Sequence, residues 1–134
     1  MSILPLYAGL IGLWLLLLSV RVIAFRRTAR VNLGHGENIE LERRIRAHAN
    51  LMEYGPVALI LLALLEWGSW SPVLLNLLGI MLIAGRFLHG WALSFTKSSS
   101  IMRVSGMVLT LTMIGISACL CLIEFVMAWN AGQS

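Results

Sequence analysis

Charged residues are scarce in this sequence, and their scarcity argues against an ordinary soluble domain. Only 12% of the 134 residues are charged, whereas 59% are hydrophobic and the mean hydropathy is +0.87. Soluble globular domains carry about 25% charged residues. The composition therefore predicts an all-α protein that resides in a lipid bilayer.

Cysteine is rarer still, and the sequence holds no recognisable metal motif. Cys119 and Cys121 lie two residues apart in an apolar run, where a helix points them to different sides. We expect no disulfide between them and expect both to be buried. His35, His48 and His89 are far apart, and no C-x-x-C or H-E-x-x-H pattern occurs, so we predict no metal site.

Four apolar segments alternate with polar connections along the chain. The predicted spans cover roughly residues 3–25, 39–67, 73–95 and 102–128. Since one span takes about 20 apolar residues, the chain reads as a single membrane domain over 1–134, a four-helix bundle that runs up and down. The second helix is expected to begin in water near residue 39, and a serine within 97–100 is expected to cap the last one.

Basic residues mark one side of the membrane. They surround the first connection and flank the third: Arg21, Arg26, Arg27, Arg30, Arg43, Arg44, Arg46, Lys97 and Arg103. Cytoplasmic loops retain lysine and arginine. We therefore expect a multi-pass protein with both termini outside the cytoplasm and both basic loops inside it. Topology accounts largely for the net charge of +4, so we expect no nucleic-acid partner.

The second span carries a polar face where it enters the membrane. Arg43, Arg46, Asn50 and Glu53 follow one another at spacings of three, four and three residues, which places them on one side of a helix. A charge at membrane depth costs at least about 2.5 kcal/mol unless it is paired or faces a wet cavity. Arg86 and His89 of the third span are expected at a comparable depth.

Two interpretations of this face stay open. Arg86 and Glu53 could form a structural ion pair between the second and third spans, with Arg43 and Arg46 anchored at lipid headgroups. Alternatively, the arginines form a cradle for a small zwitterion, in which guanidinium groups bind carboxylates and Glu53 binds an ammonium group. Arg103, at the start of the fourth span, is either a further anchor or part of that cradle.

The residues of the second span resemble a family signature. Residues 42–56 read ERRIRAHANLMEYGP and are similar to the signature of the membrane-associated proteins in eicosanoid and glutathione metabolism, the MAPEG family. The matching positions are Glu42, Arg43, Arg46, Ala47, Asn50, Glu53, Tyr54 and Pro56. Residues 24–31, AFRRTARV, also resemble the end of the family's first helix, and the pattern of four spans covers the whole chain.

This resemblance implies a homotrimer that binds glutathione between neighbouring subunits and receives hydrophobic electrophiles or lipids from the bilayer. The expected glutathione site combines the residues that match the family with those of the polar face. Its members are Arg26, Arg27, Arg43, Arg46, Asn50, Glu53, Tyr54, Arg86 and His89. Arg103 corresponds to the arginine that stabilises the glutathione thiolate in the catalytic members, and it is the expected catalytic residue.

One departure from the family keeps alternatives open. Cysteinyl-leukotriene synthase, a catalytic member, has tyrosines one and two turns after the position of Arg86, where this chain has His89 and Leu93. The leading hypothesis is a glutathione transferase or peroxidase of a bacterial inner membrane with its site on the cytoplasmic side. The alternative is a non-catalytic module that binds a lipid or a partner protein. A small multidrug exporter is disfavoured, because the first span lacks the glutamate typical of that class.

Overall fold

The computed structural model describes residues 2–96 and 100–133, which form four long helices. They are α1 (Leu4–Ala29), α2 (Ile39–Trp67), α3 (Pro72–Ser94) and α4 (Ser100–Ala131). All four are long and apolar enough to cross a membrane. Even the shortest, α3, reaches about 35 Å at 1.5 Å per residue, which exceeds the roughly 30 Å of a hydrocarbon core.

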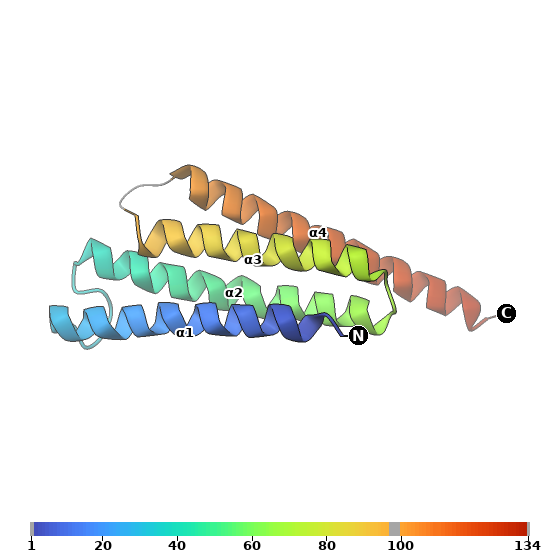
Figure 1. The fold of residues 1–134 in the computed structure, drawn as a ribbon, viewed down its shortest axis with the longest axis horizontal. Coiled ribbons are helices and arrows are strands. Elements are labelled where there is room, and N and C mark those ends of the chain that lie inside the picture. Colours follow the sequence, from blue (N-terminus) through green and yellow to red (C-terminus); the bar gives the residue numbers. More distant parts are fainter. Residues whose placement is uncertain (1, 97–99, 134) are drawn as a thin grey trace.

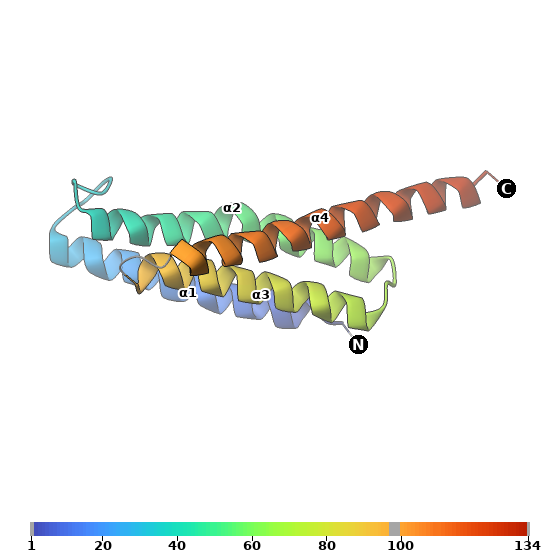
Figure 2. The same ribbon diagram turned by 90° about the horizontal axis from the view of Figure 1, so that it is seen from above.

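The helices run alternately up and down, as predicted (Figure 1). The end of α1, the start of α2, the end of α3 and the start of α4 share one end of the bundle, and both termini lie toward the other (Figures 1 and 2). The last turns of α4 extend beyond the other helices. Helices α2 and α3 each pack against all the other helices, whereas α1 and α4 make no contact within the described chain.

Local sequence explains where the helices begin and end. The side chain of Asn38 caps α2 by accepting a hydrogen bond from the backbone N–H of Leu41 at 3.0 Å. Helix α1 ends at Ala29, four residues beyond the expected limit, because Arg30 adopts a left-handed conformation (φ 54°). Pro72 opens α3. Residues 97–99, most of the stretch expected to supply the cap of α4, lie outside the described part of the chain.

Glycines on α3 let its neighbours approach closely. The ring of Tyr7 on α1 packs on Gly79, where any Cβ would overlap it. Gly85 faces Gly106 on α4, and a Cβ on either glycine would lie within 2.8 Å of the other's carbonyl oxygen. In lipid the hydrophobic effect does not drive helices together, so their packing relies on close van der Waals contact. Small residues such as these glycines allow that contact. They bring α3 into close contact with both α1 and α4.

The prediction that both cysteines are buried was wrong. Cys119 is exposed on α4 and Cys121 is only partly buried. Apolar neighbours in the sequence indicate burial in a soluble protein, but a helix face toward lipid is as apolar as one toward the core. The sequence pattern alone could not separate the two environments.

Candidate functional site

A polar pocket lies between α2, α3 and α4, toward the end of the bundle where α2 and α4 begin. It encloses about 260 Å³. Its lining residues are Arg46, Asn50 and Glu53 from α2, His89 and Leu93 from α3, and Arg103 from α4. Five of these six residues were predicted from the sequence to belong to the site, and three helices bring them together.

Helix geometry explains this convergence. Arg46, Asn50 and Glu53 are separated by four and three residues and so share one face of α2. His89 and Leu93 are one turn apart on α3, and Arg103 stands in the first turn of α4. The ends of α2 and α4 that carry these side chains lie at the same end of the bundle (Figure 1).

The pocket is open on one side of the protomer. Arg46, Glu53 and Arg103 are exposed, whereas Asn50 and His89 are partly buried. A pocket of about 260 Å³ is also smaller than the roughly 300–1,000 Å³ of typical ligand sites. The chain by itself therefore encloses a ligand in this pocket only in part.

Arg86 lies behind the pocket and not in its lining. Only 2% of its surface is exposed. Its guanidinium donates to the side-chain oxygen of Asn50 and, at 2.8 Å, to the hydroxyl of Thr110. A third contact reaches the sulfur of Met107 at 3.5 Å. Arg86 thus orients Asn50 and joins α2, α3 and α4.

The ion pair between Arg86 and Glu53 that the sequence suggested is not formed. Among the described residues, the one ion pair joins Arg44 to Glu40. Arg86 instead donates hydrogen bonds to two uncharged acceptors, the amide oxygen of Asn50 and the hydroxyl of Thr110. The reason is geometric, because Glu53 points out to the exposed side of α2 while Arg86 points into the bundle.

Tyr54 accompanies Arg86 and does not line the polar pocket. The guanidinium carbon of Arg86 lies 5.3 Å from the centroid of the Tyr54 ring, within the range of a cation–π interaction. The expectation that Tyr54 and Arg86 touch a ligand remains a prediction. In the protomer they support the pocket from behind.

The remaining arginines of the predicted set lie elsewhere in the protomer. Arg26 and Arg27 line a separate pocket with Arg30 at the end of α1, and Arg26 donates to the carbonyl of Gly34 at 2.8 Å. Arg43 donates to the carbonyls of Ala92, at 3.1 Å, and of Thr96, at the end of α3. Basic side chains often bind the last carbonyls of a helix in this way.

Sequence reasoning missed the part that Thr110 plays. Thr110 lies in the deep part of α4 and was not among the residues predicted to belong to the site. Thr110 does donate to the carbonyl of Gly106 at 3.0 Å, yet it also accepts from Arg86. The available signal was its position seven residues, or two turns, after Arg103 on the same face of the helix.

No group of three or more His, Cys, Asp or Glu side chains suited to a metal ion occurs in residues 2–96 and 100–133. The polar groups that do converge are two guanidinium groups, one carboxylate, one amide and one imidazole. Such a set can bind a small molecule that carries both carboxylates and an ammonium group.

The sequence is similar to that of a known membrane-protein family and to two curated relatives. The model of the MAPEG family matches residues 4–123 of the chain. Two relatives, each described as inner membrane protein YecN, come from Escherichia coli strain K12 and Escherichia coli O6:H1. Each is 38% identical over 84 residues, which cover 63% of this chain and 64% of the relative. The chain thus spans just under two thirds of the length of these relatives.

Proposed function

The chain belongs to the MAPEG family, and from this membership and its polar pocket we propose that it is a glutathione-dependent transferase or peroxidase of a bacterial inner membrane. Its four apolar helices and its family make it an integral multi-pass membrane protein. The inner membrane is inferred from the printed name of the two Escherichia coli relatives. The basic end of the bundle is assigned to the cytoplasm because cytoplasmic loops retain arginine and lysine.

The observation that carries this proposal is the convergence of Arg46, Glu53 and Arg103 on one pocket. Glutathione presents two carboxylates, one ammonium group and one thiol. Arg46 binds a carboxylate through paired hydrogen bonds, and Glu53 accepts from the ammonium group. Asn50, held by Arg86, supplies a fixed amide beside them. Arg103 is the remaining charged residue of the pocket, and it binds the sulfur of glutathione.

Arg103 activates the thiol by favouring its charged form. An ordinary thiol has a pKa near 8.5 and is only a few per cent thiolate at neutral pH, and a decrease of two units requires about 2.7 kcal/mol. A guanidinium group together with the positive end of α4, in whose first turn Arg103 stands, can provide this stabilisation. The surrounding lipid concentrates a hydrophobic electrophile near the sulfur.

A homotrimer would complete the site. The pocket is open, and Arg26 and Arg27 of the predicted set lie on a different face of the protomer. In an assembly of identical subunits, the end of α1 of one copy can close the pocket of the next. We therefore include the homotrimer in the proposed function, with Arg26 and Arg27 supplied from the neighbouring copy.

A second candidate is a non-catalytic protein that binds a lipid or a partner in the same pocket. The observation that favours it is that His89 and Leu93 line the pocket where a catalytic relative has tyrosines. A tyrosine hydroxyl can hydrogen-bond a ligand, whereas leucine cannot. Part of the contacts that position a thiol would then be missing.

The test is a titration of glutathione into the detergent-purified full chain, followed by near-ultraviolet thiolate absorbance. We expect a saturating band, at least a tenfold weaker band in Arg103→Ala, and an unchanged band in Arg44→Ala, which removes the same charge from a different pocket. An undiminished band in Arg103→Ala would show that this residue does not stabilise the thiolate. Calorimetric binding without any band would favour the non-catalytic candidate, and no binding at all would refute glutathione as the ligand.

A further inference from the structure

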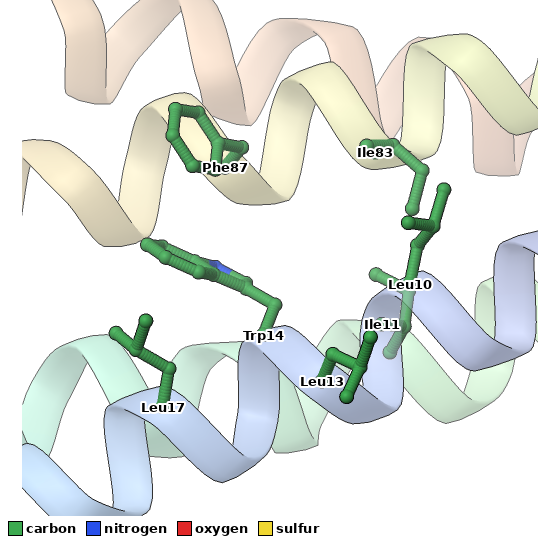
Figure 3. A pocket seen from close by; sticks show the side chains of 7 residues that line it. All are labelled: Leu10, Ile11, Leu13, Trp14, Leu17, Ile83 and Phe87. Carbon is green, nitrogen blue, oxygen red and sulfur yellow. The ribbon is translucent and has the colours of Figure 1, made fainter.

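An apolar groove runs between α1 and α3, apart from the polar pocket. It encloses about 250 Å³ and is lined by Leu10, Ile11, Leu13, Trp14 and Leu17 of α1 and by Ile83 and Phe87 of α3. Figure 3 shows these side chains along the two facing helices, with Trp14 opposite Phe87. Leu10, Leu13 and Leu17 remain exposed in the protomer, so the groove opens to the hydrocarbon of the bilayer.

A series of aromatic rings in mutual contact leads from this groove toward the basic end of the bundle. The ring centroids of Trp14 and Phe87 are 4.8 Å apart, those of Phe87 and Trp91 5.4 Å, and those of Trp91 and Phe95 4.4 Å. The series ends at Arg21, whose guanidinium carbon lies 3.7 Å from the centroid of Phe95. The apolar groove therefore continues into a charged region without a break.

That charged region is a second pocket of about 460 Å³. Its charged lining residues are Arg21, Arg43, Arg44 and Glu40, which give a formal net charge of +2. Ser94 holds Arg21 in place through hydrogen bonds of 2.9 Å and 2.7 Å. The pocket thus has a surplus of positive charge.

The length of the groove matches one leaflet of the bilayer. Leu10, Trp14, Leu17 and Arg21 follow one another at helical spacings along one face of α1, and the eleven steps along the helix from Leu10 to Arg21 rise roughly 16 Å. Half of a hydrocarbon core of roughly 30 Å is about the same depth. One acyl chain can therefore lie along the groove while its headgroup reaches the arginines.

We propose that the groove and its basic pocket bind one anionic phospholipid from the leaflet at the α1–α2 connection. Its phosphate lies between Arg21 and Arg44, since guanidinium groups pair with phosphate oxygens through two parallel hydrogen bonds. Basic pockets between transmembrane helices are a recognised way of holding lipid headgroups. Arg26, Arg27 and Arg30 project from the opposite side of α1, so a neighbour that contacts them leaves the groove accessible.

The test is native mass spectrometry of the detergent-purified full chain, titrated with phosphatidylglycerol, phosphatidylcholine or inorganic phosphate. We expect one molecule of phosphatidylglycerol to bind about tenfold more tightly than phosphatidylcholine. Arg21→Gln and Arg44→Gln abolish that preference, whereas Arg30→Gln, an equal change of charge on the far side of α1, preserves it. Leu17→Trp fills the groove and weakens binding, whereas Leu16→Trp on the same turn does not.

Four results would overturn the proposal. Equal binding of the two lipids to the wild type would indicate ordinary boundary lipid. An equal loss in Arg30→Gln would indicate diffuse surface charge. Displacement of the lipid by inorganic phosphate, with no effect of Leu17→Trp, would indicate an anion site alone. A native oligomer that carries no lipid would indicate that a second copy covers the groove. None of these results depends on glutathione, so the proposed enzymatic function is tested separately.

Discussion

Replacing Thr110 by valine tests the buried network that supports the pocket. Thr110 is fully buried and accepts a hydrogen bond from the Nε of Arg86 at 2.8 Å. Valine has nearly the same shape but no hydroxyl, so this N–H of Arg86 loses its acceptor in a place that water does not reach. Hydrogen bonds between transmembrane helices contribute about 0.6 kcal/mol on average and up to about 1.7, and an unsatisfied charged donor lies at the upper end. We expect a loss of roughly 1–2 kcal/mol in the free energy of unfolding.

The measurement is unfolding in mixed micelles of increasing dodecyl sulfate content, followed by far-ultraviolet circular dichroism. Thr112→Val serves as the matched control, because Thr112 is exposed on the same helix and surface substitutions usually change stability by less than about 0.5 kcal/mol. If both variants unfold at the same dodecyl sulfate content as the wild type, the hydrogen bond to Arg86 does not hold α3 and α4 together.

Two further substitutions test the packing between helices. Gly106→Ala should cost about 1–3 kcal/mol, because its Cβ would lie 2.7 Å from the carbonyl oxygen of Gly85, whereas Gly115→Ala on the same helix meets nothing within 4 Å and should be neutral or stabilising by up to about 1 kcal/mol. Equal stability of the two variants in the same unfolding assay would contradict close contact at Gly106. Tyr7→Phe should cost about 1 kcal/mol, since the Tyr7 hydroxyl donates to the side-chain oxygen of Asn76 at 2.8 Å, and an unchanged midpoint would argue against that bond.

Much of the fold could be predicted from the sequence, because its signals are local. The length of an apolar run and the polar connections around it indicate a membrane span, and residues such as Asn38 and Pro72 mark helix starts through bonds to their own neighbours. The family resemblance rested on two short segments, residues 42–56 and 24–31, and on the pattern of four spans, and the match over 4–123 confirmed it. The convergence of Arg46, Asn50 and Glu53 followed from helical spacing alone.

The partners of those residues across the bundle were decided only by the tertiary structure. A sequence fixes which side chains share a helix face but not how each helix is rotated about its axis or how deep it sits. For this reason Arg86 was expected to pair with Glu53, whereas the bundle directs it to Asn50 and Thr110. The groove between α1 and α3 has the same origin, because its two walls come from segments some seventy residues apart. Gly90 lets the ring of Trp14 pack closely on α3, because a Cβ there would lie 3.0 Å from the ring nitrogen.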